Sequence, residues 1–165
     1  MKKTILWLCV ILWMIIIFLF SNMNSTSSNG SSTKIINDTI EQTVEIAEST
    51  GIIDEKPSEK KINNLVDDLN KPLRKCAHST VYFILATLLI LAIKEINKDK
   101  RKVVIFTFII SFIYACTDEI HQLFISGRTG HLTDVLIDMI GVILACLIYI
   151  FITYKKREMN YEKNK

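Results

Sequence analysis

Seven ionisable side chains lie between residues 118 and 138, where two strongly apolar segments of the chain meet. They are four carboxylates, two imidazoles and one guanidinium, namely Asp118, Glu119, His121, Arg128, His131, Asp134 and Asp138. A charged side chain within a bilayer costs about 2.5–3.5 kcal/mol on insertion scales, so such residues usually mark a functional site. Paired carboxylates in a low-dielectric site can work as acid and base, because one holds a proton while the other is ionised. We therefore expect the functional site in this stretch.

Helical spacing predicts that polar residues on both sides of this stretch share a face. The positions i, i+4, i+7 and i+11 hold Ser111, Ala115, Asp118 and Gln122 in one segment and Asp134, Asp138, Gly141 and Ala145 in the next. Gly141 and Ala145 form a small-xxx-small pair, which permits close approach of another helix. The carboxylate face and the packing face of the later segment are therefore predicted to coincide.

An earlier segment offers basic and aromatic groups for the same site. Arg74, His78 and Tyr82 follow one another at intervals of four residues, and Lys75 lies three residues before His78. Folded together, the three faces predict one polar pocket. Its candidate catalytic residues are His78, Asp118 and Glu119, and its candidate ligand-binding residues are Arg74, Lys75, Tyr82, Gln122, Arg128, Asp134 and Asp138.

Three uses of this pocket remain open from the residues alone. In an active site, His78 would act as a base while arginine or lysine holds a phosphate or carboxylate. In a binding site, the same groups would hold a ligand without reacting. In a structural network, each charge would neutralise a neighbour and fix the register of the helices.

Neither a metal nor another cofactor is predicted. His78, Asp118, Glu119 and His121 are acceptable ligand types, but no HExxH or equivalent spacing accompanies them. The four cysteines fall one to each apolar segment without a CxxC spacing, so neither a disulfide framework nor a zinc site is indicated: Cys9, Cys76, Cys116 and Cys146.

The composition predicts how these groups are held. Half of the 165 residues are hydrophobic, and they cluster in segments near the 20 residues that cross a bilayer, at 4–20, 76–93, 103–122 and 135–154. We therefore predict an all-α polytopic membrane protein with about four transmembrane helices. The first segment could be a cleaved signal peptide, but it is long for one and lacks an Ala-x-Ala-like site, which favours a retained anchor.

Basic residues predict the orientation. Five lie in residues 94–102 and five in the tail 155–165, and Lys2 and Lys3 open the chain, whereas the connection between the last two segments has only Arg128. The positive-inside rule then predicts cytoplasmic termini in a bacterial cytoplasmic membrane and a pocket that faces outward. The net charge of +3 comes from these flanks and does not indicate nucleic-acid binding.

Residues 21–75 are predicted to form an outward-facing loop with a linker and two short amphipathic helices. Residues 21–32 are almost wholly Ser, Asn, Thr and Gly, as in flexible linkers. The first helix would end at Gly51, and the second would begin after Ser58 as N-cap and end before Pro72. The two helices would either rest on the bundle or form a mobile cap over the site.

These residues resemble the VanZ-like family of bacterial integral membrane proteins, which is named for a teicoplanin-resistance protein. The resemblance covers about residues 71–152 and rests on Lys75-x-x-His78-x-x-x-Tyr82, on Asp118-Glu119-x-x-Gln122-x-Phe124, and on Gly127-Arg128 followed by Asp134-Val135-x-x-Asp138-x-x-Gly141. It departs at Asp138, where the family has Asn, and it leaves out the loop of residues 21–75. It implies an all-helical membrane protein and, for the founding member, low-level glycopeptide resistance without a settled biochemical activity.

We accordingly expect action at the outer membrane face on an anionic or lipid-linked cell-envelope precursor, or exclusion of a glycopeptide from it. In this hypothesis anionic groups are engaged by Arg74, Lys75 and Arg128. Two alternatives stay open. The protein could be a non-catalytic scaffold of an envelope enzyme. It could also be a small proton-coupled transporter, which would need polar residues deeper in the membrane than Asp138 and His78.

Overall fold

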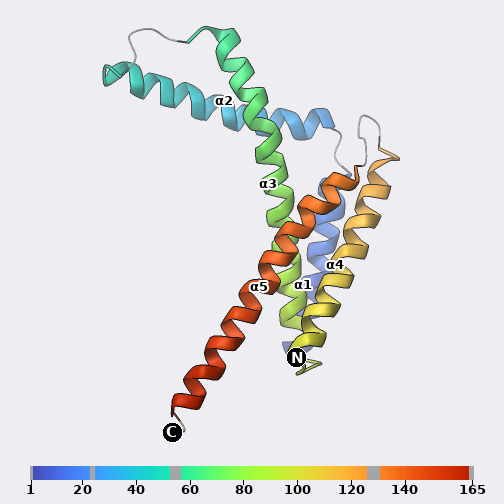
Figure 1. Ribbon diagram of the computed structural model, residues 1–165. Helices are drawn as coiled ribbons and strands as arrows, with labels where there is room; N and C mark the ends of the chain where they lie inside the picture. Colours follow the sequence, from blue (N-terminus) through green and yellow to red (C-terminus); the bar gives the residue numbers. More distant parts are fainter. Residues whose placement is uncertain (1, 23–24, 53–56, 126–130, 164–165) are drawn as a thin grey trace. The chain divides into compact units, whose positions relative to one another are not determined.

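The computed structural model describes residues 2–22, 25–52, 57–125 and 131–163, and all regular structure in these ranges is helical. The helices, shown in Figure 1, are α1 (Lys2–Ser21), α2 (Ser25–Ser49), α3 (Glu59–Ile93), α4 (Lys100–Gln122) and α5 (Leu132–Lys163). Four of them contain stretches long and apolar enough to cross a membrane: Lys2–Ser21, Lys75–Ile93, Lys100–Gln122 and Leu132–Glu162. The predicted all-α polytopic fold is confirmed.

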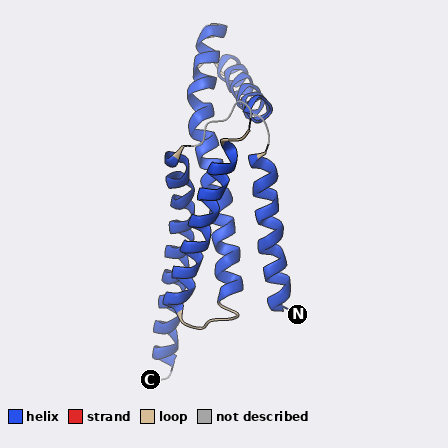
Figure 2. Ribbon diagram, turned by 90° about the vertical axis from the view of Figure 1, so that its right-hand side faces the viewer, coloured by secondary structure: helices blue, strands red, loops and turns tan. Residues whose placement is uncertain are grey.

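Contacts along the chain define two units. The four-helix unit comprises Met1–Asn22 and Ala77–Lys165, and the second unit comprises Met23–Cys76. In the four-helix unit, α1 and α4 run in one direction, while the apolar part of α3 and α5 run in the other (Figures 1 and 2). This alternation follows from the sequence, because each apolar stretch is followed by a polar connection before the next one begins.

The second unit is a pair of helices, α2 and the first part of α3. Among its described side chains, Ile36 of α2 and Val66 of α3 are buried, whereas Leu65 and Leu69, which the helical spacing predicts on the same apolar face as Val66, are exposed. α2 ends two residues before Gly51, whose positive φ of 69° ends the helix in the way that glycine allows. Ser58 directly precedes α3, as predicted for its N-cap, and its carbonyl accepts the first backbone hydrogen bonds of the helix.

Two features of this unit differ from the sequence prediction. α2 begins at Ser25, so most of the predicted linker is helical. Helix propensity is a weak prior, since Ser, Thr and Asn each disfavour a helix by only about 0.7 kcal/mol or less. α3 also continues through Pro72, where a helix end was predicted. Proline removes one backbone hydrogen bond, but the helical turns on both sides of Pro72 are formed.

The core of the four-helix unit lies along one face of each helix. Tyr82, Leu85 and Leu89 of α3 are fully buried, as is Val142 of α5. On α4 the buried positions recur every three or four residues, at Val103, Thr107, Ser111, Ala115, Asp118 and Gln122, and Glu119 beside Asp118 is buried as well. The other faces expose large apolar side chains, which is the distribution expected of helices surrounded by lipid.

α3 and α5 approach each other closely at Gly141. A Cβ atom on Gly141 would collide with the backbone carbonyl oxygen of Ser79 and lie 2.9 Å from the backbone nitrogen of Phe83. Only a residue without a side chain allows this approach, so the prediction from the small-xxx-small pair is confirmed.

Among the described residues, two side-chain hydrogen bonds join α1 to other helices. The indole N–H of Trp13 donates to the carbonyl of Val81 in α3 at 3.1 Å. The hydroxyl of Tyr114 in α4 donates to the carbonyl of Met14 at 2.6 Å. Both rings are partly buried and need a partner for their polar atom, which a carbonyl on a neighbouring helix provides.

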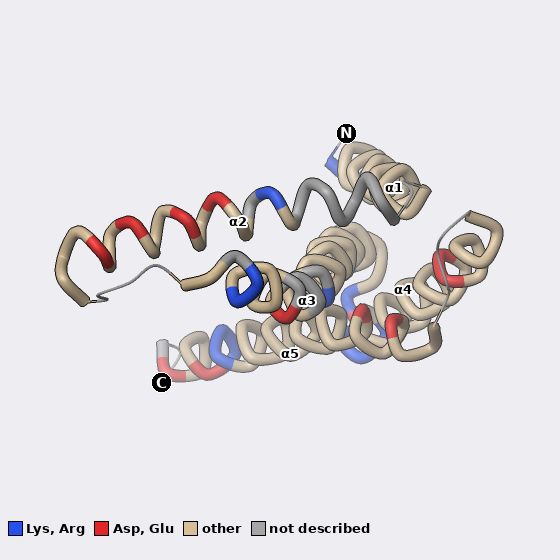
Figure 3. Tube along the Cα trace, turned by 90° about the horizontal axis from the view of Figure 1, so that it is seen from above, with Lys and Arg blue, Asp and Glu red and all other residues tan. Residues whose placement is uncertain are grey.

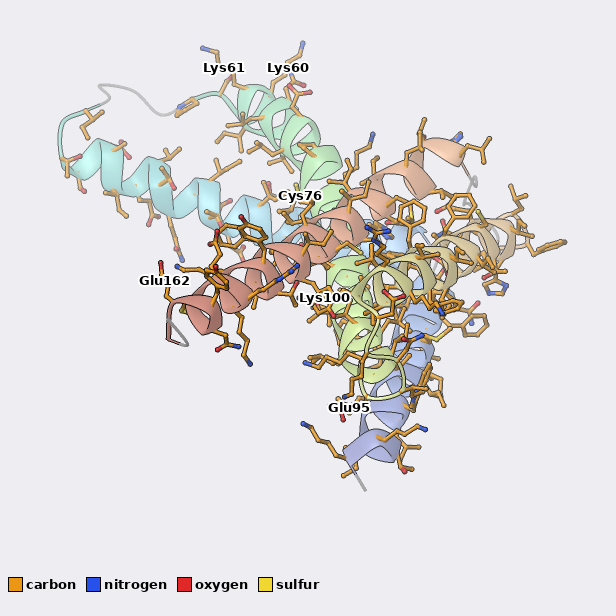
Figure 4. The ribbon with its side chains drawn as sticks, turned by 60° about the horizontal axis from the view of Figure 1, so that its bottom comes forward. Lys60, Lys61, Cys76, Glu95, Lys100 and Glu162 are labelled. Atoms are coloured by element: carbon orange, nitrogen blue, oxygen red, sulfur yellow. The ribbon has the colours of Figure 1, made fainter. Side chains whose placement is uncertain are left out.

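Charged residues gather at the end of the four-helix unit where α1 begins. Lys2 Nζ lies 3.5 Å from Glu95 Oε1, and Lys100 Nζ donates to the carbonyl of Thr153 at 3.3 Å. Glu95 and Lys100 are labelled in Figure 4. The side chain of Asp99 accepts a bond from the backbone N–H of Arg101 at 3.0 Å and so caps α4. We call this the basic end.

Candidate functional site

Four carboxylates lie at the opposite end of the four-helix unit, where α4 ends and α5 begins. Figure 3 shows acidic residues on both helices. Only 2% of Asp138 is exposed, 6% of Asp118 and 8% of Glu119, while Asp134 is half-buried. We call Asp118, Glu119, Asp134 and Asp138 the acidic cluster. Their burial follows from the helical spacing, because the same faces carry the buried residues Ala115 of α4 and Gly141 and Ala145 of α5.

Electrostatic interactions link the members of this cluster to each other. Asp138 interacts with Glu119, Asp118 and Asp134. Among the described residues, the charges that act on Asp138 are therefore all acidic. Repulsion between like charges is strong where the surroundings have a low dielectric constant. Such a cluster needs protons or a positive group nearby to remain buried.

Hydrogen bonds fix two of the four carboxylates. The amide nitrogen Nε2 of Gln122 donates to Oδ2 of Asp118 one turn away, at 3.3 Å. The backbone N–H of His131 donates to Oε2 of Glu119 at 3.0 Å. The carbonyl of His131 in turn accepts from the backbone N–H of Asp134 at 2.9 Å, in the first turn of α5. Glu119 thus attaches the start of α5 to α4.

Tyr82 extends the site to α3. Its side chain is 1% exposed and interacts electrostatically with Asp118, Asp138 and Glu119. Its ring lies 6.3 Å from that of Tyr114, centroid to centroid, in a tilted arrangement. The phenol therefore belongs to the same site as the carboxylates of α4 and α5.

Several buried polar atoms around the cluster have no hydrogen-bond partner among the described residues. They include the hydroxyls of Tyr82, Ser111 and Thr107, Oδ1 of Asp138 and Nε2 of His121. Ser111 and Thr107 precede Asp118 by seven and eleven residues, about 10 and 16 Å along α4. Buried polar side chains on α4 therefore continue from Asp118 towards the start of this helix. A buried polar atom without a partner is costly, so these atoms indicate a place for a ligand, a proton or water.

The histidines do not all face the cluster. The ring of His121 stacks on Phe18 of α1, with centroids 4.6 Å apart and an interplanar angle of 28°. His131 is exposed just before α5, and His78 is partly buried one turn before Tyr82 on α3. His121 is therefore a packing residue towards α1.

Among the described side chains, the structure brings together these candidate residues of the four-helix unit: Tyr82, Asp118, Glu119, Gln122, Asp134 and Asp138. Lys75 is exposed on α3, in the second unit. The side chain of Arg74 and all of Arg128 lie outside the described residues. In the described ranges, no three His, Cys, Asp or Glu side chains are grouped so that they could hold a metal ion.

Two residues of α4, Tyr114 and Thr107, have no role in the sequence predictions. Tyr114 lies four residues before Asp118 and interacts with it electrostatically. Thr107 lies four residues before Ser111 and continues the buried polar face. Helical spacing from Asp118 backwards would have indicated both, because each lies within about one turn of a residue already on that face.

Comparison with protein families identifies the chain. The sequence model of the VanZ/LLP1 family matches residues 6–153, which includes the loop that the resemblance of residues 71–152 left out. No curated protein and no solved structure matches the chain significantly. The match covers most of the chain, and four of its helices are long and apolar enough to cross a membrane. The chain therefore belongs to the VanZ/LLP1 family and is a multi-pass membrane protein.

Proposed function

We propose that this protein acts at the outer face of the bacterial cytoplasmic membrane on an anionic or lipid-linked component of the cell envelope. The observation that carries the proposal is the acidic cluster, three of whose members are less than a tenth exposed. Burying several like charges is unfavourable by several kcal/mol per ion, on the order of the stability of a domain. A protein retains such a group where it binds or reacts with something.

The charge distribution supports the outward orientation of the cluster. Lysine and arginine residues concentrate at the basic end, in residues 94–102 and 155–157. By the positive-inside rule this end faces the cytoplasm. The end that carries the acidic cluster then faces the compartment in which lipid-linked precursors are assembled into the cell wall.

The candidate residues divide into two groups by charge. The basic residues Arg74, Lys75 and Arg128 engage phosphate or carboxylate groups of the ligand, as guanidinium and ammonium groups do. The acidic cluster accepts hydrogen bonds from the ligand's polar groups or exchanges protons with them. In this proposal His78 acts as a base, and Tyr82 and Gln122 act as hydrogen-bonding partners.

Resistance to a glycopeptide such as teicoplanin is the biological consequence that we propose. A protein that binds or alters a precursor at the outer face would reduce the amount available to the antibiotic. The test is teicoplanin susceptibility of a sensitive Gram-positive host that expresses the wild type, Glu119→Gln or Asp134→Asn at matched membrane levels. Glu95→Gln is the matched control, since this carboxylate lies at the basic end, 3.5 Å from Lys2.

Each outcome of this test has a distinct meaning. Protection by the wild type and Glu95→Gln, but not by the two cluster variants, supports a function of the acidic cluster. Equal protection by all four proteins would mean that the acidic cluster has only a structural role. Absence of protection by the wild type separates this chain from glycopeptide resistance.

A second candidate function is a non-catalytic scaffold for an envelope enzyme. The hydrogen bonds from His131 to Glu119 and from Gln122 to Asp118 favour it, because both serve the fold of the protein itself. The abundance of each variant in the membrane distinguishes the two candidate functions. Loss of protection at unchanged abundance supports the binding or catalytic function, whereas loss of the protein from the membrane supports the scaffold.

A further inference from the structure

An apolar groove lies between α4 and α5 in the four-helix unit. Its volume of about 340 Å³ is within the range of ligand sites, about 300–1,000 Å³, and the described residues that line it are all apolar. Cys146 at its base is only 6% exposed, whereas Ile105, Phe108 and Leu147 at its rim are well exposed. In a membrane this groove opens to the hydrocarbon of the bilayer, so an apolar chain can fill it.

One end of the groove lies near the basic end of the unit. Val104, which lines the groove, is four residues after Lys100, about 6 Å along α4. Ile150 lines the groove from α5 and is three residues before Thr153. The Nζ atom of Lys100 donates to the carbonyl of Thr153 at 3.3 Å, so these two residues connect the helices just beyond the groove. The groove therefore reaches the level of the charged side chains.

Helical spacing places one arginine from each helix on the faces that form the groove. Arg101 of α4 precedes Ile105 by four residues and Phe108 by seven, and Arg157 of α5 follows Ile150 by seven. Residues at these intervals share one side of a helix. Both arginines are exposed, so their guanidinium groups are accessible to a ligand at the end of the groove.

The carboxylates nearest to these arginines along the chain have other partners. The side chain of Asp99 accepts a hydrogen bond from the backbone N–H of Arg101 at 3.0 Å. The side chain of Glu158 is hydrogen-bonded to Tyr154. Two guanidinium groups and the ammonium group of Lys100 outnumber these two carboxylates, so this end of the groove attracts an anion.

The size of the rim residues favours a lipid over another helix. Helices that pack together in membranes meet at small residues, which let their backbones approach, as Gly141 does between α3 and α5. The groove instead has isoleucine, leucine and phenylalanine at its rim. Such side chains keep a second backbone at a distance and leave room for a flexible chain.

Phosphate is the anion that suits the two arginines. A guanidinium group binds phosphate through two parallel hydrogen bonds, which an ammonium group does not offer. Basic residues between transmembrane helices at the level of the head groups bind anionic lipids. A phospholipid with a net negative charge combines this phosphate with an apolar chain that fits the groove.

We propose that the groove between α4 and α5 binds an anionic phospholipid of the bilayer, with an acyl chain along the groove and the phosphate at Arg101 and Arg157. This site lies towards the opposite end of the unit from the acidic cluster, and the inference does not depend on the proposed function. A lipid bound there contacts both helices, so it stabilises their association next to Lys100 and Thr153.

The test is native mass spectrometry of the full-length protein released from detergent micelles, which gives the Kd of the first bound lipid. Dioleoyl phosphatidylglycerol should bind about tenfold more tightly than dioleoyl phosphatidylcholine, which has the same chains and no net charge. Dihexanoyl phosphatidylglycerol has the same head group on short chains. It should bind at least about tenfold more weakly than the dioleoyl form.

Variants at the end of the groove locate the phosphate. Arg101→Gln and Arg157→Gln should each weaken the binding of dioleoyl phosphatidylglycerol about fivefold. Lys155→Gln is the matched control, because it removes the same charge from another face of α5, two residues before Arg157. This control should bind the lipid as the wild type does.

A variant within the groove locates the acyl chain. Leu147→Trp puts a larger side chain into the groove and should weaken the binding of both dioleoyl lipids, whereas Leu144→Trp, on an exposed part of α5 outside the groove, should not. A circular-dichroism spectrum equal to that of the wild type ensures that each variant is folded. If Leu147→Trp does not fold, the two arginine variants decide the test.

Four results would overturn the inference. Equal binding of the two dioleoyl lipids would mean that the groove holds bulk lipid without selecting a head group. Equal effects of Arg157→Gln and Lys155→Gln would mean that only the total charge of the basic end matters. Tighter binding of undecaprenyl phosphate than of dioleoyl phosphatidylglycerol would assign the groove to a polyprenyl chain. A dimer that Leu147→Trp dissociates would assign it to a second copy of the protein.

Discussion

The backbone N–H of His131 donates a hydrogen bond to Oε2 of Glu119 at 3.0 Å, which joins the residue before α5 to the buried face of α4. Glu119 and His131 lie in the sequence on either side of the connection that contains Arg128. A side chain with a candidate role in the site therefore also fixes how the last helix begins. Changes at Glu119 will affect the fold and the site together, and the two effects need separate measurements.

Glu119→Ala should lower the stability of the protein more than Glu119→Gln. Alanine removes the acceptor of this part-buried hydrogen bond from the backbone N–H of His131, which costs about 1–3 kcal/mol. Glutamine keeps an oxygen acceptor and removes one charge from a group of like charges, so we expect a smaller change in stability, of about 1 kcal/mol or less. Urea or thermal unfolding in detergent measures both variants. Equal stability of the two would mean that this hydrogen bond does not hold α5 in place.

Gly141→Ala should destabilise the contact between α3 and α5. The added Cβ would collide with the carbonyl oxygen of Ser79, and helices that must move apart lose about 1–3 kcal/mol. Thermal unfolding in detergent gives the size of the loss. Leu144→Ala is the matched control, because Leu144 is an exposed residue of the same helix.

Ser79→Gly should not rescue Gly141→Ala. The obstructing atom belongs to the backbone of Ser79 and remains when its side chain is removed. Rescue by this second change would place the collision in the side chain and would contradict the close approach of the two helices.

Tyr114→Phe should loosen the attachment of α1. The change removes only the hydroxyl that donates to the carbonyl of Met14 at 2.6 Å. Hydrogen bonds between helices in membranes contribute about 0.6 kcal/mol on average and at most about 1.7 kcal/mol. We expect a loss in that range, measured by unfolding in detergent. A loss well above it would show that Tyr114 has a second role, for which its electrostatic interaction with Asp118 is the evident source.

Much of the helical arrangement around the site could be predicted from the sequence because it depends on spacing within one helix. Asp118 and Gln122 on α4, and Asp138 and Gly141 on α5, fall on single faces whatever the neighbouring helices are. His121 could not be placed in this way. It lies three residues after Asp118, near the edge of the buried face, and only the position of Phe18 on α1 decides its direction.

The continuation of α3 through Pro72 was not predictable either. The sequence rule that ends a helix before proline weighs only the local hydrogen bond. The helix is formed on both sides of Pro72, from Glu59 to Ile93, and its later part carries the buried residues Tyr82 and Leu85. The packing of residues far along the chain from Pro72 therefore outweighs the local effect of this proline. Composition and spacing do not predict such packing.

The orientation of the protein can be decided with two single cysteines in a cysteine-free version of the chain. We expect Gly130→Cys, in the connection before α5, to react with a membrane-impermeant maleimide added to intact cells. Lys98→Cys, at the basic end between α3 and α4, should react only after the membrane is permeabilised. The reason is the number of lysine and arginine residues at the basic end, which resist translocation. The reverse labelling pattern would put the acidic cluster on the cytoplasmic side and remove the basis for action on exported envelope components. If neither cysteine reacts in intact or permeabilised cells, the labelling is repeated after denaturation, which exposes both cysteines.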